Sequence, residues 1–222
     1  MIRHWLGNLA LCAALLGGPA AAMAQEYDEG IDYQRISPPQ PTASADKVEV
    51  VELFWYGCPH CHQLEPLLHK WLEKQPDHVE FVRLPALLNP NWELLTRAYI
   101  TADLLGVVED VHTDLFDRIH VKRDRSLHSE DGLAAFFAEH GVDEQKFRET
   151  FHSFATMTRV NQSRLMSRRY GVNGVPTIIV NGKYRANASM AGGTHEGMLR
   201  VVDHLIEKEY KAMNPATADA QK

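Results

Sequence analysis

Two cysteines separated by two residues are the groups in this chain best suited to chemistry. Cys58 and Cys61 enclose the run CPHC, which follows an apolar stretch at residues 50–55 and a turn at Gly57. The apolar stretch predicts a buried strand, and the run after it predicts the start of a helix. A cysteine at a helix start faces unpaired backbone N–H groups and the positive end of the helix dipole, which both favour a thiolate. Because the thiolate is the nucleophile of disulfide exchange, the pair predicts thiol–disulfide chemistry.

Position within the helix predicts a different role for each cysteine. Cys58 lies at the helix start and is expected to be the attacking or attacked sulfur, whereas Cys61 lies one turn inside and is expected to resolve. Pro59 suits the first turn, and His60 can add positive charge or a donor toward the Cys58 sulfur. A stabilised thiolate favours the reduced protein, so the disulfide becomes a stronger oxidant.

Two further residues have both a structural and a functional interpretation. Glu52 interrupts the predicted strand and is either an outward-facing acid or a buried carboxylate that relays a proton near the cysteines. Pro176 follows Val175 at the start of a second strand, where either a cis or a trans peptide bond is compatible with the sequence. A cis bond beside the cysteines would leave the neighbouring backbone free to pair with an extended substrate.

The first 24 residues have the pattern of a secretory signal peptide. An apolar run at Leu9–Leu16 is too short for a comfortable membrane span, and Ala22-Met23-Ala24 is a small-x-small cleavage site, so the mature chain is expected to begin at Gln25. An uncleaved anchor is the alternative. Cleavage would remove Cys12 and one arginine, so the net charge would change from −6 to −7. An acidic chain argues against nucleic acid as the main partner.

The remaining pattern predicts an α/β fold. Strands are expected at Lys47–Trp55, Val79–Leu84, Val175–Val180 and Lys183–Ala186, with helices at Pro59–Lys74 and Gly197–Tyr210 and a hairpin turn at Asn181-Gly182. Between residues 91 and 170 the periodicity is helical, with core positions predicted at Phe136, Phe137, Phe147, Phe151 and Phe154. The sequence therefore predicts a thioredoxin-like domain at 25–90 and 171–211, an inserted all-helical subdomain at 91–170, and a flexible tail at 212–222.

The chain resembles the DsbA family of periplasmic thiol:disulfide oxidoreductases in four features taken together. They are the CPHC run, Glu52 six residues before Cys58, the run Gly174-Val175-Pro176-Thr177 and the inserted helices. The resemblance implies that Cys58, Pro59, His60 and Cys61 form the redox motif, that Pro176 is cis, and that Val175, Pro176 and Thr177 contact the substrate. It also implies that Glu52 is a buried acid with Arg83 nearby. The segment 84–92 is unlike the best-known members.

The resemblance also implies partners and a location. A member of this family needs no metal or cofactor, acts as a monomer in the periplasm, and oxidises exported proteins that carry free cysteines. It is then reoxidised by a DsbB-like quinone-linked membrane protein. A reductase or isomerase is the nearest alternative, but isomerases similar to this group carry an N-terminal dimerisation domain, whereas only residues 25–46 of the expected mature chain precede the strand at Lys47–Trp55.

An alternative from another class uses the same residues. The run CPHCH at residues 58–62 is the attachment pattern of c-type haem, in which both cysteines would form thioethers and His62 would be an axial ligand. The position of the motif after a buried strand argues against it, and Pro176 would then have no role. A zinc site would need a second pair of ligands at a defined spacing, and the 12 histidines are scattered.

Overall fold

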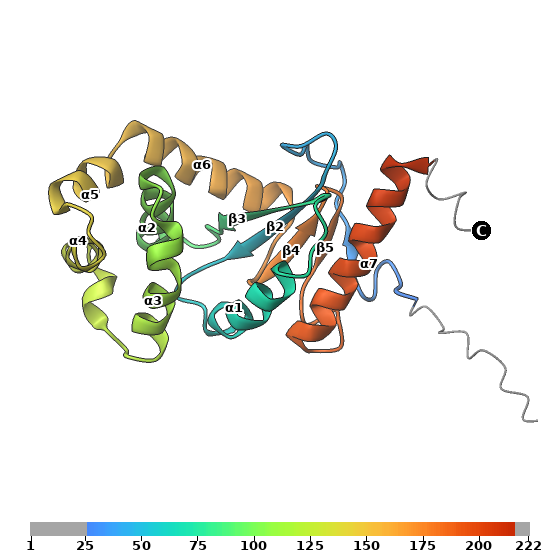
Figure 1. The fold of residues 1–222 in the computed structure, drawn as a ribbon, viewed down its shortest axis with the longest axis horizontal. Coiled ribbons are helices and arrows are strands. Elements are labelled where there is room, and N and C mark those ends of the chain that lie inside the picture. The colour runs from blue at the N-terminus through green and yellow to red at the C-terminus, as the bar shows by residue number, and fades with distance from the viewer. Residues whose placement is uncertain (1–25, 216–222) are drawn as a thin grey trace, which may run out of the picture.

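A five-stranded mixed sheet forms the centre of the molecule (Figure 1). The computed structural model describes residues 26–215, so the predicted signal peptide and the end of the tail lie outside the described residues. The strands are β1 (Gln34–Arg35), β2 (Val48–Phe54), β3 (Val79–Pro85), β4 (Thr177–Val180) and β5 (Tyr184–Ala186), in the spatial order β1-β5-β4-β2-β3. Strand β2 is parallel to β3 and antiparallel to β4, as the strand–helix–strand order predicts for the first pair.

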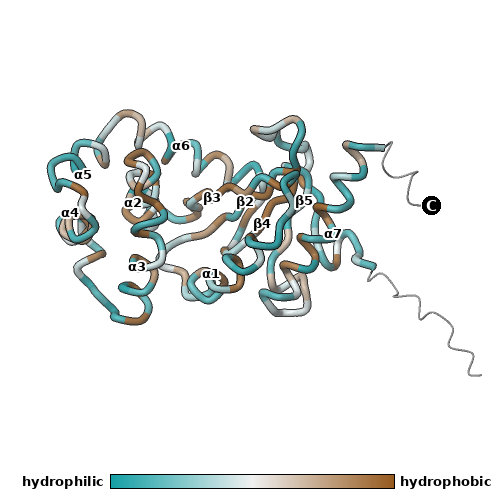
Figure 2. Tube along the Cα trace, viewed as in Figure 1, coloured by the Kyte–Doolittle hydropathy of each residue, from teal (hydrophilic) through white to brown (hydrophobic). Residues whose placement is uncertain are grey.

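Every residue of β2 is buried, because the strand is covered on both faces. Val48 and Val50 point toward one face, where they pack against helices α1 (Pro59–Leu72) and α7 (His195–Met213). Val51 and Leu53 point toward the other face, where Met166 and Tyr170 near the end of α6 (Phe154–Arg169) cover them. Figure 2 shows the apolar segments concentrated in the strands, whereas α5 (Glu144–Phe151) is largely hydrophilic.

The helices between β3 and β4 lie mostly at the end of the sheet away from α7, and α6 runs from them back to the sheet (Figure 1). They are η1 (Pro90–Trp92), α2 (Glu93–Leu105), α3 (Val108–His120), η2 (Arg125–His128), α4 (Glu130–Glu139), α5 and α6. The predicted fold class, a thioredoxin-like sheet with inserted helices, is confirmed. The domain limits themselves stay a prediction.

The phenylalanines of the helical layer were predicted to be core, and one of them is not. Phe136, Phe137, Phe147 and Phe151 are buried, with ring centroids of consecutive members 4.6 to 5.7 Å apart. Phe154 is 81% exposed, so its assignment to the core was wrong. It is the first residue of α6, directly after the cap residue Ser153, and at that position the side chain points away from the packed layer.

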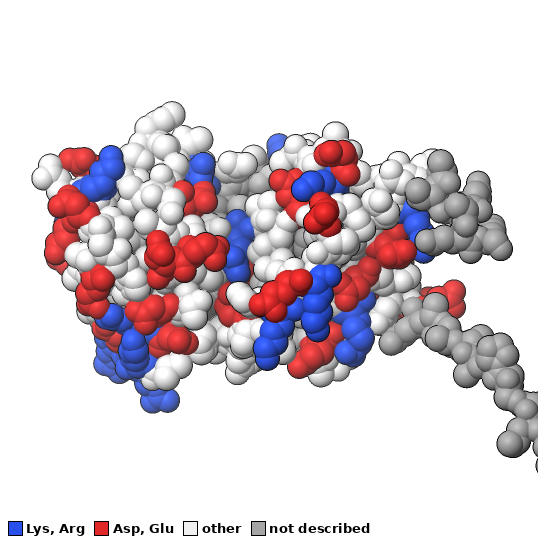
Figure 3. Space-filling view, in the orientation of Figure 1, with Lys and Arg blue, Asp and Glu red and all other residues white. Residues whose placement is uncertain are grey.

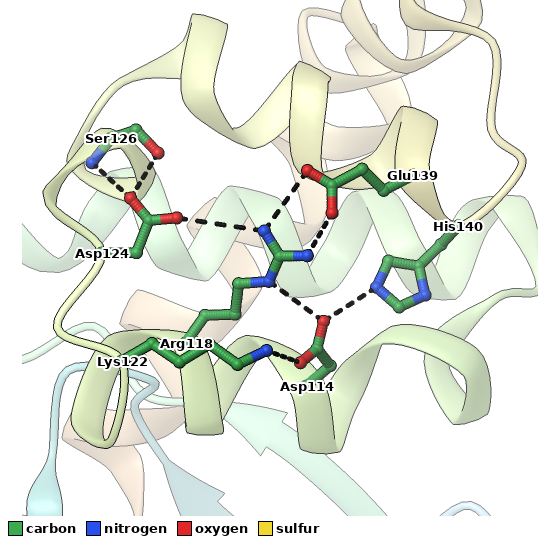
Figure 4. A network of polar contacts seen from close by, with 7 residues as sticks. All are labelled: Asp114, Arg118, Lys122, Asp124, Ser126, Glu139 and His140. Carbon is green, nitrogen blue, oxygen red and sulfur yellow. Dashed lines mark hydrogen bonds and ion pairs between the residues drawn. The ribbon is translucent and has the colours of Figure 1, made fainter.

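A network of charged groups holds the outer helices together (Figure 4). Arg118 on α3 contacts Asp114 on its own helix, Glu139 at the end of α4, and Asp124 just before η2. Its guanidinium carbon also lies 5.3 Å from the centroid of the Phe136 ring. These contacts tie α3 to α4.

Strands β4 and β5 form the predicted hairpin. Asn181 and Gly182 have φ values of 50° and 64°, as a type I′ turn requires. A Cβ atom at Gly182 would lie 2.1 Å from the carbonyl oxygen of Gln40, so only glycine fits. Helix α7 begins two residues earlier than predicted because the Thr194 hydroxyl caps it, accepting from the N–H of Gly197 at 2.9 Å. It ends at Met213 rather than Tyr210.

The surface shows no strong preference for one sign of charge on the face drawn in Figure 3, where acidic and basic side chains are interspersed with uncharged areas. Among residues 26–215, no helix combines the length and the apolar character that crossing a bilayer would need.

Candidate active site

Cys58 is the N-cap residue of α1, as its place in the sequence predicts. Its extended backbone (φ −92°, ψ 115°) leads into Pro59 at the first helical position. The backbone N–H of Cys61 donates to the Cys58 sulfur at 3.4 Å, and the Cys58 thiol donates to the carbonyl oxygen of Val175 at 3.3 Å. Both cysteines are unbonded. Cys58 is 8% exposed and Cys61 is fully buried, so only Cys58 is open to an incoming sulfur.

The surroundings push the pKa values of the two thiols in opposite directions. Hydrogen bonding from the Cys61 side chain, followed by the backbone N–H groups of Cys61 and His60, outweighs burial and lowers the pKa of Cys58 from 9.0 to about 6. Burial, reinforced by the hydrogen bond to Cys58, raises the pKa of Cys61 far above its usual range. At neutral pH the arrangement therefore favours a thiolate at Cys58 and a thiol at Cys61.

The His60 ring contributes less to stabilising the Cys58 thiolate than its position in the sequence suggested. Its Nδ1 atom lies 3.2 Å from the Oε1 atom of Gln63, and no hydrogen bond joins the ring to the Cys58 sulfur. The charge of the ring is the last of the influences that lower the pKa of Cys58, after its own backbone N–H. His60 therefore acts on the sulfur mainly through its main chain.

The peptide bond between Val175 and Pro176 is cis, which the sequence left open and the resemblance implied. The loop that carries it lies against Cys58 through the Val175 carbonyl oxygen. Thr177 is 2% exposed, and its hydroxyl donates to the Gly174 carbonyl oxygen at 2.8 Å. Its side chain therefore supports the loop, while Val175 and Pro176 present their backbone beside the cysteines.

Open cavities adjoin this loop on both sides. One, of about 600 Å³, is lined by His60, Val175 and Pro176 together with His195 at the start of α7. The other, of about 430 Å³, is lined by Leu87, Leu88, Asn89, Pro90, Arg164, Arg168, Val172 and Asn173. Part of the segment 84–92 thus lines a cavity that adjoins the cis-proline loop.

Trp55 and Gly57 shape the turn between β2 and α1. The ring of Trp55 stacks on that of Trp92, with centroids 4.4 Å apart and planes within 4° of parallel. A Cβ atom at Gly57 would lie 2.3 Å from the Trp55 ring, which the stacked Trp92 holds in place. Glycine is therefore required at this position, directly before Cys58.

Glu52 is fully buried in β2 and lies near Arg83, whose Nε atom is 3.4 Å from its Oε2 atom. Burial, and then the charge of Glu65, raises the pKa of Glu52 above its ordinary value of 4.5, although Arg83 acts in the other direction. Glu52 also acts electrostatically on Cys61. Of the two interpretations that the sequence allowed, the buried carboxylate is the one found.

Two residues beside Glu52 were missed in the sequence. Glu65 on α1 contacts Arg83 at 3.3 Å and His112 on α3 at 3.2 Å. Glu65 could have been found from its spacing, because it lies one helical turn after Cys61 and so on the same face. Nothing in the sequence signalled His112, which reaches the site from the inserted helices.

The arrangement does not suit a c-type haem. Cys61 is completely buried in the apolar core, so its sulfur is not accessible to a haem edge. His62 is held by Asp117, whose Oδ1 atom lies 2.8 Å from its Nε2 atom, and it stacks on His120. In the described part of the chain, no group of three or more His, Cys, Asp or Glu side chains is arranged to hold a metal ion.

Comparison with known proteins agrees with this geometry. Residues 49–199 match the model of the DSBA-like thioredoxin domain. The thiol:disulfide interchange protein DsbA of Pseudomonas aeruginosa is 44% identical over 211 residues, which are 95% of this chain and 99% of that protein. DsbA of Burkholderia cepacia is 35% identical and covers 93% of this chain and 97% of that protein.

Solved structures give the same result. The crystal structure of Pseudomonas aeruginosa DsbA superposes with a TM-score of 0.78 at 42% identity, covering 88% of this chain and 97% of that one. The oxidoreductase DsbA from Xylella fastidiosa superposes with a TM-score of 0.77 at 36% identity, covering 82% of this chain and 97% of that one. The resemblance seen in the sequence is therefore confirmed, and the chain belongs to the DsbA family of thiol:disulfide oxidoreductases.

Proposed function

We propose that this protein donates the disulfide between Cys58 and Cys61 to exported proteins that carry free cysteines. The observation that carries the proposal is the placement of the two sulfurs: Cys58 at the N-cap of α1 accepts from the backbone N–H of Cys61, whereas Cys61 is fully buried. The pKa of Cys58 is lowered to about 6 and that of Cys61 is raised. At pH 7, lowering the first pKa from 9 to 6 stabilises the reduced protein by about 1.4 kcal/mol, which shifts the reduction potential by ~30 mV toward a stronger oxidant.

The two sulfurs take consecutive roles in the proposed reaction. A substrate thiolate attacks the Cys58 sulfur, the bond to Cys61 breaks, and a mixed disulfide forms while Cys61 takes the electron pair and then a proton. A second substrate thiolate attacks the substrate sulfur, and Cys58 leaves as the thiolate that α1 stabilises. The exposure of Cys58 and the burial of Cys61 support this order.

The substrate is an extended segment of an incompletely folded chain. It would lie in the cavity beside Pro176 and pair with the backbone next to Val175, whose carbonyl oxygen is directed at Cys58. Glu52 supplies the proton that Cys61 requires, because it is buried beside that cysteine and its pKa is raised. These roles for Val175, Pro176 and Glu52 are part of the proposal.

The proposed setting is the periplasm, with export directed by residues 1–24. The protein would act as a monomer and be reoxidised by a DsbB-like quinone-linked membrane protein, as its family membership suggests. Size-exclusion chromatography with light scattering tests the monomer. The partner is tested by incubating the reduced protein with membranes that contain such a quinone-linked enzyme and measuring the fraction of the protein that becomes oxidised.

A reductase or an isomerase is the competing function, and equilibration with glutathione buffers separates the reductase from a disulfide donor. The mature protein is incubated at fixed ratios of reduced to oxidised glutathione, and the fraction of oxidised Cys58–Cys61 is read after acid quenching and alkylation. A donor is mostly reduced in buffers where a structural disulfide stays oxidised. A pair that stays oxidised in strongly reducing buffer would assign the protein to the reductases.

A further inference from the structure

One of the two cavities at the cis-proline loop is lined by two arginines and by no acidic residue. It has a volume of about 430 Å³ and lies between the segment after β3, the end of α6 and the loop that leads to β4. Arg164 and Arg168 reach it from α6, and Leu87, Leu88 and Val172 belong to its apolar lining. A group that enters this cavity therefore meets two positive charges beside apolar side chains.

The cavity adjoins the surface that is proposed to bind the substrate. Asn173 lines both this cavity and the one of about 600 Å³ beside His60 and Pro176. It comes two residues before Val175, whose carbonyl oxygen lies 3.3 Å from the Cys58 sulfur. An extended chain advances about 3.3 Å per residue. A peptide that pairs with the backbone at Val175 and follows the loop toward residue 172 thus reaches the cavity within a few residues of its reacting cysteine.

Two contacts fix the wall of the cavity formed by the segment after β3. The backbone N–H of Leu87 donates to the hydroxyl oxygen of Ser167 on α6 at 3.3 Å. Trp92, at the other end of the segment, stacks on Trp55, which precedes Cys58 by three residues, with ring centroids 4.4 Å apart. The cavity therefore has a fixed position relative to the active-site turn, and a group that binds there does not have to order its walls.

The positive charge at this cavity is only partly balanced by the protein. Arg164 lies 3.1 Å from Glu93, but Glu93 also lies 2.9 Å from Arg97 and is shared between the two. Arg168 is exposed and forms no ion pair with any other residue of 26–215. Helix α6 contains four arginines and no Asp or Glu, although the chain as a whole carries a net charge of −6. An anion is thus missing beside Arg168.

The helix dipole explains arginine at the end of α6 but not its place in the cavity. Arg168 and Arg169 both lie in the last turn, where the negative end of the dipole favours a positive side chain. Both are exposed, and neither forms an ion pair within the described part of the chain. Only Arg168 lines the cavity. The two arginines therefore share the structural role and differ in their access to the site.

We propose that Arg168, assisted by Arg164, binds the carboxylate of an aspartate or glutamate that lies about two to four residues from the reacting cysteine of the substrate. The inference rests on the proposed function and adds a preference to it: exported chains with an acidic residue close to the cysteine are oxidised faster. A guanidinium can hold a carboxylate by two parallel N–H···O bonds. Leu88 and Val172 then pack against the methylene groups of the acidic side chain. The bound acid holds the substrate cysteine beside Cys58.

The cavity on the other side of the loop is less suited to an acid. His60 and His195 line it, and their ring centroids lie 6.5 Å apart, but Glu196 lines it as well. This carboxylate repels an incoming acid, whereas the cavity at Arg168 has no carboxylate in its lining. The preference is therefore expected on one side of the substrate cysteine and not on both.

The test compares Arg168→Gln with Arg169→Gln in the mature protein. The substrates are pairs of peptides with one cysteine, in which glutamate or glutamine occupies in turn each of four positions on either side. Stopped flow measures the rate at which each peptide opens the disulfide of the oxidised protein. The rate of the same peptide with oxidised glutathione corrects for the effect of the acid on its own cysteine.

The glutamate peptide is expected to react about threefold to fivefold faster than the glutamine peptide, the value of a partly exposed ion pair. This advantage should occur at one or two adjacent positions on one side, in the wild type and in R169Q. In R168Q the ratio of the two rates should fall to about one. Sodium chloride should reduce the ratio in the wild type, because salt screens exposed charges.

Reversal of the charge separates recognition from a general loss of activity. Arg168→Glu should react faster with lysine than with glutamine at the position that the scan identifies, whereas Arg169→Glu should not. Thermal unfolding shows whether each variant is folded. If neither substitution of Arg168 by Gln or Glu folds, Arg168→Lys is measured, which keeps the charge but not the paired hydrogen bonds and should retain only part of the preference.

The outcomes also distinguish this inference from the function on which it rests. A glutamate advantage that is absent at every position, or that persists in R168Q, would overturn the acid-binding site and leave disulfide donation intact. An equal loss in R168Q and R169Q would also overturn it, because it would show a diffuse attraction to the end of α6. A wild type that oxidises no peptide of either kind would instead refute the proposed function.

Discussion

The thiol of Cys58 donates a hydrogen bond to the backbone carbonyl oxygen of Val175, 3.3 Å away, and thus joins two residues that are 117 positions apart in the sequence. The bond exists only while the sulfur is protonated. When Cys58 is a thiolate, the carbonyl loses its donor and is free to accept a backbone N–H from a bound peptide. The protonation of the nucleophile and the availability of this acceptor are therefore linked.

Replacing Cys61 by alanine should raise the pKa of Cys58. Hydrogen bonding from the Cys61 side chain is the largest of the influences that lower this pKa to about 6. A hydrogen bond to a charged group is worth about 1.5–3 kcal/mol, so its loss should raise the pKa by about one unit or more. Titration of the thiolate absorbance in the ultraviolet measures it. The backbone N–H of residue 61 remains in this variant, and an unchanged midpoint would mean that the backbone alone stabilises the sulfur.

Replacing His60 by alanine should have a smaller effect in the same direction. The ring makes no hydrogen bond to the sulfur, its charge lowers the pKa of Cys58 less than the hydrogen bonds do, and the backbone N–H of residue 60 is retained in the variant. Exposed charge interactions contribute at most about 1 kcal/mol, so the shift should stay well below that of Cys61→Ala. The same titration gives both values. A larger shift in His60→Ala than in Cys61→Ala would show that the imidazole reaches the sulfur in solution.

The sequence predicted those features of the site that are set by residues close together in the chain. Cys58 at the N-cap, Pro59 in the first turn and the fully buried strand that precedes them are set by neighbouring residues, and the structure has them as the pattern indicates. The hairpin at Asn181 and Gly182 was equally clear, because a type I′ turn needs positive φ values at both central positions and few residue types accept them.

Features that depend on contacts between distant segments could not be predicted in this way. His112 meets Glu65 only because α3 packs against α1, and the amphipathic pattern of α3 gives no reason to separate this histidine from ordinary core positions. The state of the peptide bond before Pro176 was open for the same reason, since both isomers fit the local sequence. Phe154 matched the helical spacing of its neighbours, but its exposure is decided by where α6 begins.

The buried carboxyl group of Glu52 predicts a dependence of stability on pH. The pKa of Glu52 is raised in the folded protein, whereas in the unfolded chain it has its ordinary value of 4.5. Above pH 4.5 the unfolded chain therefore releases a proton that the folded protein keeps. The free energy of unfolding should fall by up to about 1.4 kcal/mol per pH unit from this group, until the pH reaches the raised pKa of the folded state.

Replacing Glu52 by glutamine should remove this component. The difference in the free energy of unfolding between Glu52→Gln and the wild type, both reduced, is measured by urea denaturation at several pH values. The variant should become progressively more stable relative to the wild type as the pH rises above about 4.5. The titration of Cys58 contributes to both proteins and cancels in the difference. A difference that does not vary with pH would show that Glu52 ionises normally in the folded protein.

The helical layer offers a direct comparison of two phenylalanines. Phe137 is fully buried beside Phe147, with ring centroids 4.6 Å apart, whereas Phe154 is 81% exposed. Phe137→Ala should therefore lower the free energy of unfolding by about 3–5 kcal/mol, because it removes buried apolar surface and leaves a cavity. Phe154→Ala should change it by no more than about 0.5 kcal/mol. Urea denaturation of the two variants measures both, and the Cys58 pKa serves as a check that the active site is intact. A loss at position 154 comparable to that at 137 would mean that Phe154 is covered in solution.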